Sequence, residues 1–276
     1  MKNTIIRTIS GICFLGVMLG GFLIHPYAFA ALHVLIIAGM LAEFFHMSMG
    51  KRYPLQRILA ILFGCGLFLS FFAFLGYKMP KHFLALNGIP ILAILISTLY
   101  LKDKEDLRDL AFVFMGLLYI VPSVITAIAL VFKTEDGNFS GMLLLAFFCI
   151  IWCSDVGAYV FGHLFGQNGK KLFPSVSPKK SWAGFWGGLV LAVGAGIALH
   201  YAGLFKFSLI HSIVISVIMN IAGVYGDLFE SVWKRKFGFK DSGNVIPGHG
   251  GLLDRFDSAL FAIPTGLAYL LLFGLL

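Results

Sequence analysis

Hydrophobic residues occur along this chain in long unbroken runs that short polar segments separate. A run of about 20 apolar residues forms a helix that can cross the roughly 30 Å hydrocarbon core of a bilayer. Unpaired backbone groups are costly in hydrocarbon, which restricts membrane spans to helices or a closed barrel. The runs lack period-two alternation, so the pattern favours helices. We place about nine spans, at residues 7–24, 27–46, 57–77, 82–101, 109–132, 139–165, 182–205, 208–230 and 257–276.

Composition supports a membrane protein. Hydrophobic residues make up 59% of the chain and charged residues 12%, whereas a soluble domain carries about 25% charged residues. We therefore predict an all-α fold, a polytopic transmembrane helical bundle. We divide it into an N-terminal region of five spans, residues 1–138, and a C-terminal catalytic region of four spans, residues 139–276.

The N-terminus has features of a secretory signal. Lys2 and Arg7 precede the first apolar run, and Ala28-Phe29-Ala30 resembles a cleavage site. Because further apolar spans follow at once, we expect a retained first helix.

Basic residues indicate the orientation of the spans. With the N-terminus in the cytoplasm, 17 of the 21 Lys and Arg residues lie in cytoplasmic segments. The other four are Lys78, Lys81, Lys133 and Lys206. The positive-inside rule then predicts a cytoplasmic N-terminus and places the polar breaks at 167–181 and 226–257 in the cytoplasm. The net charge of +8 is mostly this topological signal, and charges scattered over loops argue against nucleic-acid binding.

Two polar positions lie within or at the end of apolar runs. Asp155 is inside a predicted span, where a charged residue costs about 2.5–3.5 kcal/mol on insertion scales. Such a residue either faces a wet cavity or pairs with a partner, and both interpretations stay open. Glu43 and His46, near the end of the second span, are interpreted as interfacial or helix-pairing residues.

The densest polar run extends over residues 226–257. Four of its side chains recur at helical spacings of three and four and therefore share one helix face: Asp227, Glu230, Ser231 and Lys234. Asp254 and Asp257 share a face in the same way if the last helix begins near Leu252. Gly250-Gly251 permits a tight turn and a close approach to a ligand, and Pro247 stiffens the entry to that turn.

This mixture of charges indicates a chemistry. Clustered carboxylates suit Mg²⁺, which binds one or two carboxylates together with substrate phosphate oxygens. Neighbouring Lys and Arg side chains suit phosphate itself. The combination suggests metal-assisted phosphoryl or nucleotidyl transfer at a membrane surface. A solvated loop that obeys the positive-inside rule is the alternative, but that rule does not require acidic residues at the ends of spans.

The same run resembles a known family. Residues 231–257 resemble the sequence pattern of phosphatidate cytidylyltransferases, the CDP-diacylglycerol synthases. The matching positions are Ser231-x₂-Lys234-Arg235-x₄-Lys240-Asp241-x-Gly243-x₂-Ile246-Pro247-x-His249-Gly250-Gly251-Leu252-x-Asp254-Arg255-Phe256-Asp257. Two further segments are similar to the same family, Trp152–Gly162 and Ser177–Gly184. Ala183 stands where the family usually has Glu, and Trp233 where it has an aliphatic residue or Phe. The resemblance covers residues 140–276.

The resemblance implies an activity and its partners. The reaction converts CTP and phosphatidic acid to CDP-diacylglycerol and pyrophosphate, with one or two Mg²⁺ ions. The partners are CTP, phosphatidic acid and the lipid bilayer, and a homodimer is one assembly to consider. The location is the bacterial inner membrane, with the active site facing the cytoplasm.

The resemblance also suggests roles for individual residues. Asp227 and Asp254 are the favoured metal ligands, with Asp257 and Asp155 as further candidates. The remaining candidates are phosphate-binding or phosphate-orienting residues: Lys234, Arg235, Lys240, Arg255, Ser231, His249, Gly250, Gly251, Lys179 and Lys180. For the acidic residues and for Lys179 and Lys180, a purely structural role is the alternative. Rival functions are a polytopic transporter and another CTP-using lipid-phosphate enzyme.

Overall fold

The computed structural model describes residues 2–101, 107–132 and 138–276. Three basic residues used to predict the orientation, Lys102, Lys104 and Lys133, lie outside these ranges. Eight helices in the described ranges are long and apolar enough to cross a membrane, and a shorter apolar helix covers Arg7–Leu23. The predicted all-α polytopic bundle is thereby confirmed.

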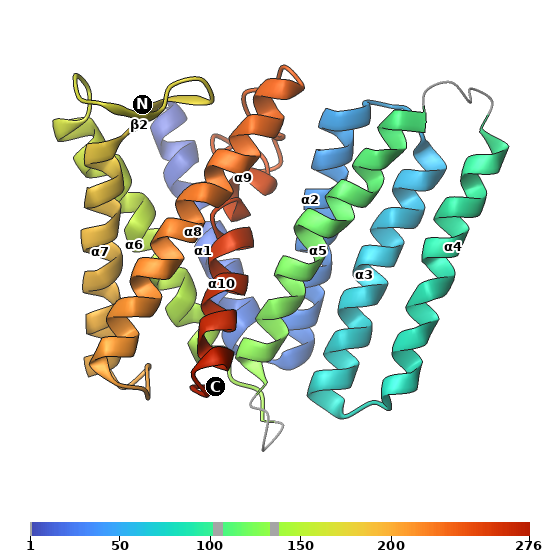
Figure 1. The fold of residues 1–276 in the computed structure, drawn as a ribbon, viewed down its shortest axis with the longest axis horizontal. Coiled ribbons are helices and arrows are strands. Elements are labelled where there is room, and N and C mark those ends of the chain that lie inside the picture. Colours follow the sequence, from blue (N-terminus) through green and yellow to red (C-terminus); the bar gives the residue numbers. More distant parts are fainter. Residues whose placement is uncertain (1, 102–106, 133–137) are drawn as a thin grey trace. The chain divides into compact units, whose positions relative to one another are not determined.

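The elements follow in chain order (Figure 1). They are α1 (Lys2–Leu23), α2 (Pro26–Met49), α3 (Pro54–Tyr77), η1 (Lys81–Asn87), α4 (Gly88–Ser97), η2 (Thr98–Tyr100), η3 (Leu107–Leu110), α5 (Ala111–Val131), α6 (Met142–Phe165), β1 (Lys171–Phe173), β2 (Ser177–Ser181), α7 (Trp182–Tyr201), α8 (Leu209–Lys236), α9 (Leu253–Phe256) and α10 (Ala259–Leu272).

Local sequence signals fix where several helices begin. Pro26 and Pro54 occupy first-turn positions of α2 and α3, where the missing N–H is not needed by the helix. The hydroxyl of Ser181 accepts a hydrogen bond from the Gly184 N–H and caps α7. Ser208 caps α8 in the same way. These caps satisfy N–H groups that have no partner within the helix.

The chain forms two compact units. Unit 1 comprises Met1–Ser140 and Phe239–Arg255, and unit 2 comprises Gly141–Gly238 and Phe256–Leu276. The sequence-based division grouped residues 239–255 with the C-terminal helices, but in the structure they belong to the unit of the N-terminal helices. The reason is a set of long-range hydrogen bonds to α2, described below.

Unit 1 packs α1, α3 and α5 against α2, and α4 lies beside α3 (Figure 1). Its core is rich in aromatic rings. Phe29 on α2 contacts Phe68 and Phe72 on α3, and it also contacts Phe139. Phe132 packs edge-on against Phe72. These offset and edge-to-face pairs add to the packing of side chains that are otherwise only apolar.

Unit 2 packs α6 against α7, and α8 against both α7 and α10. Small residues allow the close contact of α6 with α7. A Cβ at Gly157 would lie 2.5 Å from the Gly187 carbonyl oxygen, and one at Gly188 would lie 2.9 Å from that of Ser154. Small residues are typical of helix interfaces in membranes, where packing and not hydrophobicity holds helices together.

The outer surface is apolar. Leu35, Leu62 and Leu118 are 68%, 64% and 73% exposed on α2, α3 and α5. Such a surface is stable only against lipid, so the chain is an integral membrane protein.

Three details differ from the predicted spans. A small antiparallel hairpin, β1–β2, occupies the polar break between α6 and α7. The helix predicted to end at residue 230 continues to Lys236, and its last turn contains the basic residues Lys234, Arg235 and Lys236, which are favourable at a helix C-terminus. A short additional helix, α9, precedes the predicted last span, and Asp257 and Ser258 separate it from α10, so Asp254 and Asp257 do not share one continuous helix face.

Candidate active site

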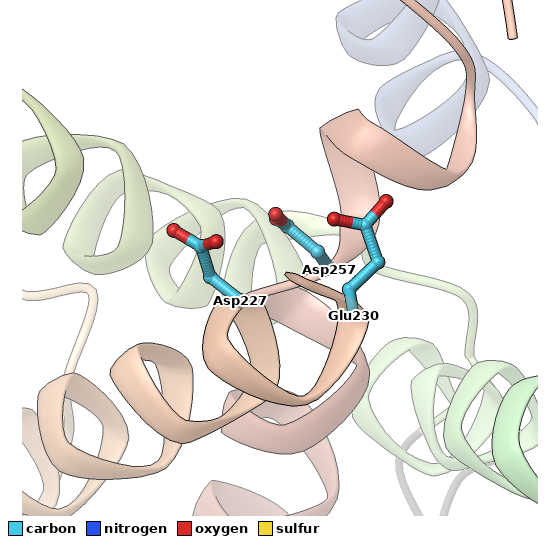
Figure 2. Close-up of side chains that lie close together, drawn as sticks. All are labelled: Asp227, Glu230 and Asp257. Atoms are coloured by element: carbon cyan, nitrogen blue, oxygen red, sulfur yellow. The ribbon is translucent and has the colours of Figure 1, made fainter. Parts of the chain in front are cut away.

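Three carboxylates gather in unit 2. One oxygen each of Asp227, Glu230 and Asp257 lies within 4.8 Å of the others. Figure 2 shows the three side chains close together, two from a single turn of α8 and one from the neighbouring chain segment. We call these three residues the acidic cluster. The predicted helix face of Asp227 and Glu230 is confirmed, and Asp257 joins it.

The backbone positions Asp257 closely. It lies in the two-residue break between α9 and α10, and its Oδ1 accepts a hydrogen bond of 2.6 Å from the Ser258 N–H. Gly226 on α8 leaves room for this segment, since a Cβ there would lie only 2.4 Å from the Asp257 carbonyl oxygen. A side chain at position 226 would therefore push Asp257 away from α8.

Two lysines balance the negative charge. Lys180 on β2 places its Nζ 2.5 Å from the Asp227 Oδ2. Lys234, one helical turn beyond Glu230, forms an ion pair with that residue, and both are buried. Ser231 donates a 3.4 Å hydrogen bond to the Asp227 Oδ1. The structure thus brings together five residues predicted for the site: Asp227, Asp257, Ser231, Lys234 and Lys180.

Asp155 on α6 belongs to the surroundings of the acidic cluster. It acts electrostatically on Asp257, as do Asp227 and Glu230. The predicted intramembrane aspartate therefore lies near other acidic groups of unit 2.

The acidic cluster has the chemistry of a cation site. Like charges this close repel one another unless cations or protons intervene. An oxygen-only donor set suits hard cations such as Mg²⁺ and Ca²⁺, not the softer metals that bind Cys or His. The adjacent ammonium groups are donors for phosphate oxygens. The residues present therefore fit a divalent cation bound beside a phosphate-containing substrate.

Asp254 lies in unit 1 and has a different environment. Its Oδ2 accepts hydrogen bonds from the Ser242 N–H at 2.9 Å, the Ser242 hydroxyl at 3.0 Å and the Gly251 N–H at 2.8 Å. This carboxylate closes the segment 242–251 into a loop. The pairing of Asp227 with Asp254 as metal ligands joins residues of two units and stays a prediction.

The tight turn of this loop differs from the predicted one. It is formed by residues 246–249, with the His249 N–H donating to the Ile246 carbonyl at 2.9 Å. Pro247 and Gly248 occupy its two central positions, and Gly248 has a φ of +76°, a combination typical of a type II turn. The turn was predicted at Gly250-Gly251. Gly251 instead packs closely against protein side chains. A Cβ at this position would lie only 2.1 Å from the Ser242 hydroxyl oxygen.

The other predicted residues are distributed over both units. The His249 Nδ1 lies 2.9 Å from the hydroxyl oxygen of Ser10 on α1. The same hydroxyl lies 2.9 Å from the Pro247 carbonyl oxygen, to which it can donate. Lys179 is exposed on β2, next to the ion-paired Lys180. Three more basic side chains are exposed in or beside the polar run: Arg235, Lys240 and Arg255. Phosphate binding by these residues and by Gly250 and Gly251 stays a prediction.

Two acidic residues were not assigned to the site from the sequence. Glu230 had a signal, namely its spacing of three from Asp227 on the same helix face. Glu43 had none, because its hydrogen-bond partners lie about 200 residues away: Ser242, Leu252 and Leu253. Its interpretation as an interfacial or helix-pairing residue was incomplete, since it is buried and binds a loop.

Known proteins resemble this chain over most of its length. A family model described as the cytidylyltransferase family matches residues 5–273. The phosphatidate cytidylyltransferase of Staphylococcus saprophyticus is 38% identical over 172 residues, which cover 62% of this chain and 63% of that protein. The protein of the same name from Staphylococcus aureus is 37% identical over 171 residues, 62% of this chain and 63% of the relative. One from Staphylococcus epidermidis is 29% identical over 271 residues, 95% of each chain.

Proposed function

Because the chain belongs to the cytidylyltransferase family, we propose that it transfers the cytidylyl group of CTP to phosphatidic acid, producing CDP-diacylglycerol and pyrophosphate. The relatives named phosphatidate cytidylyltransferase support this choice of substrates. The observation that carries the proposal is the acidic cluster with its two ion-paired lysines in a membrane protein. Its carboxylate oxygens suit a divalent cation, and its ammonium groups can donate hydrogen bonds to phosphate oxygens.

We propose that Asp227, Glu230 and Asp257 hold Mg²⁺, with one or two ions bound. Asp254 and Asp155 are the further proposed ligands. A bound Mg²⁺ neutralises phosphate charge and stabilises the leaving pyrophosphate. The oxygen-only donor set supports this ion over zinc or copper.

The protein side chains have a defined task in this reaction. An oxygen of the phosphatidate phosphate bonds to the α-phosphorus of CTP, and the bond from that phosphorus to the bridging oxygen of the β-phosphate breaks. The attacking phosphate is already anionic near neutral pH, so the step requires little help from a general base. The protein must instead bring anions together, and fixed cations lower that electrostatic cost.

The ion pairs that Lys180 and Lys234 form with carboxylates of the acidic cluster support these two residues as candidates for this task. We propose that they bind phosphate oxygens of the substrates. Further phosphate contacts are proposed for the remaining candidates: Lys179, Arg235, Lys240, Arg255, Ser231, His249, Gly250 and Gly251.

The proposed orientation rests on the charge distribution along the chain, and the bacterial inner membrane is proposed from the bacterial relatives. The N-terminus and the polar segments at 167–181 and 226–257 face the cytoplasm of a bacterial inner membrane. Phosphatidate then keeps its acyl chains in the bilayer while its headgroup meets soluble CTP at the membrane surface.

The experiment uses the purified full-length protein in detergent micelles that contain phosphatidate. CTP is added across a Mg²⁺ titration, and CDP-lipid and pyrophosphate are quantified together. Equal amounts of the two products are expected. A CTP-dependent lipid kinase would release CDP and no pyrophosphate, whereas a transporter would form neither CDP-lipid nor pyrophosphate, and either result would refute the proposed reaction.

Matched variants test the metal site separately. Asp227→Asn, Glu230→Gln and Asp257→Asn should each lower kcat/KM by at least about 100-fold, since each removes one charged oxygen ligand. Asp109→Asn is the control, because Asp109 is also ion-paired, to Arg52, but lies in unit 1 outside the acidic cluster. Wild-type Mg²⁺ dependence in all three cluster variants would rule out this metal site, but it would not contradict the proposed reaction.

A further inference from the structure

Glu43 is a buried carboxylate in an apolar helix. It lies on α2, with only 7% of its surface exposed, among buried residues such as Met40, Phe44 and Met47. A charged group in such surroundings is stable only when hydrogen-bond donors replace the lost water. The structure provides these donors from residues about 200 positions later in the chain.

Both carboxylate oxygens of Glu43 accept hydrogen bonds from the loop. Oε1 accepts from the Leu252 N–H at 2.8 Å. Oε2 accepts from the Leu253 N–H at 2.8 Å and from the Ser242 hydroxyl at 3.0 Å. Two of these donors are backbone groups at the start of α9, so Glu43 fixes the main chain of the loop and not only a side chain.

The loop is shaped to receive this carboxylate. A Cβ at Gly243 would lie 2.6 Å from the Glu43 Oε1, and a Cβ at Gly251 would lie 2.6 Å from its Oε2. Both distances are below the 3.0 Å that real Cβ atoms keep. Glycine at these two positions therefore makes the space that Glu43 occupies.

Ser242 connects Glu43 to Asp254. Its hydroxyl lies 3.0 Å from the Glu43 Oε2 and 3.0 Å from the Asp254 Oδ2. Asp254 also accepts from the N–H groups of Ser242 and Gly251. The position of Asp254 thus depends on a loop backbone that Glu43 holds at its two ends.

We infer that Glu43 is a positioning residue for the proposed reaction: it holds the loop 242–253 on α2 and thereby fixes Asp254. It does not touch substrate in this role. The inference rests on the proposed function, because Asp254 matters for turnover only if it serves that reaction. Residues that orient ligands in this indirect way usually change metal affinity or activity when they are replaced.

The first test is Glu43→Gln, which keeps the shape of the side chain but removes its charge and one acceptor oxygen. Amide hydrogen exchange in peptides covering residues 242–253 should become at least about 10-fold faster, while peptides of α6 and α7 stay unchanged. The kcat/KM should fall about 10- to 100-fold and the Mg²⁺ concentration for half-maximal activity should rise. Glu43→Asp, which keeps the charge, should lie between wild type and Glu43→Gln.

Gly243→Ala provides a second route that leaves the carboxylate in place. The three heavy atoms nearest to its Cβ all belong to Glu43, so it should displace that side chain and produce the same loop exchange and the same Mg²⁺ shift. Asp109→Asn is again the control and should match wild type.

Several outcomes overturn the inference. Unchanged exchange in Glu43→Gln means that Glu43 does not hold the loop. Faster exchange with wild-type kinetics and Mg²⁺ dependence means that the contact is structural only. If the wild-type protein itself produces no CDP-lipid, the proposed function fails and the positioning role falls with it, even where the exchange result shows that Glu43 holds the loop.

Discussion

Replacing Gly226 with alanine tests whether the packing of α8 sets the geometry of the acidic cluster. The new Cβ would lie 2.4 Å from the Asp257 carbonyl oxygen, whereas real Cβ contacts stay at 3.0 Å or more. Residue 257 and α8 must therefore separate by about 0.6 Å. Because Asp227 is the next residue of α8, this separation increases the distance between Asp227 and Asp257 in the acidic cluster.

The size of the effect can be worked out for stability and for activity. Overpacking of this kind costs about 1–3 kcal/mol, and the better helix propensity of alanine offsets up to about 1 kcal/mol of that cost. The net decrease in the free energy of unfolding should therefore lie between about 0 and 3 kcal/mol. A misplacement approaching 1 Å in a reacting site costs about 100-fold in rate, so Gly226→Ala should lower kcat/KM by about 10- to 100-fold and raise the Mg²⁺ concentration for half-maximal activity.

Gly223→Ala is the matched control, one helical turn earlier on the same face of α8. Its Cβ would lie 3.5 Å from the Ser258 Cβ, an ordinary van der Waals contact. Both variants are assayed for CDP-lipid formation across a Mg²⁺ titration, with Tm measured in the same detergent. We expect Gly223→Ala to keep wild-type activity. Equal kinetics for the two variants would refute the link between this close approach and the acidic cluster.

Three further predictions concern neighbouring residues. Lys180→Met removes the cation beside Asp227, so kcat/KM should fall about 10- to 100-fold through loss of a charge-assisted phosphate contact. The Mg²⁺ concentration for half-maximal activity should decrease, because less positive charge repels the ion. An increase in that concentration would contradict the prediction. Asn220→Ala removes the buried acceptor of the Ser154 hydroxyl, which lies 2.7 Å from the Asn220 Oδ1. The loss should cost about 1–3 kcal/mol of stability and lower Tm, while kcat per folded molecule stays unchanged. Lost turnover at a normal Tm would instead indicate that Asn220 belongs to the active site. Ser181→Ala removes the cap of α7 and should cost about 0.5–2 kcal/mol, measured as a lower Tm, and an unchanged Tm would show that the cap does not contribute.

The sequence predicted the helices well because apolar length is a direct requirement of the bilayer. It was less informative about where polar helix ends lie. Hydropathy ends near Glu230, yet α8 continues to Lys236, and within this extension Lys234 forms a buried ion pair with Glu230 one turn before it. The predicted start of the last span at residue 257 lies close to the observed start of α10 at Ala259, but the short helix α9 before it was not predicted.

Helix pairing could not be predicted for a physical reason. In lipid, apolar side chains gain no hydrophobic free energy by facing another helix, so the hydrophobic pattern does not indicate which helix faces meet. Shape decides instead, as where Gly157 allows α6 to touch the backbone of α7 at Gly187. The acidic cluster was partly predictable because Asp227 and Glu230 are close in sequence, whereas Glu43 has only distant partners.

The distance in sequence between Glu43 and its donors has a consequence for biosynthesis. The Leu253 N–H follows Glu43 by 210 residues, and a ribosome that adds about 5–20 residues per second needs roughly 10–40 s to reach it. During that interval α2 has been synthesised with an acidic group whose donors do not yet exist. A nascent chain that stops before residue 242 lacks all three of these donors, so Glu43 in a truncated product has a different environment from Glu43 in the finished protein.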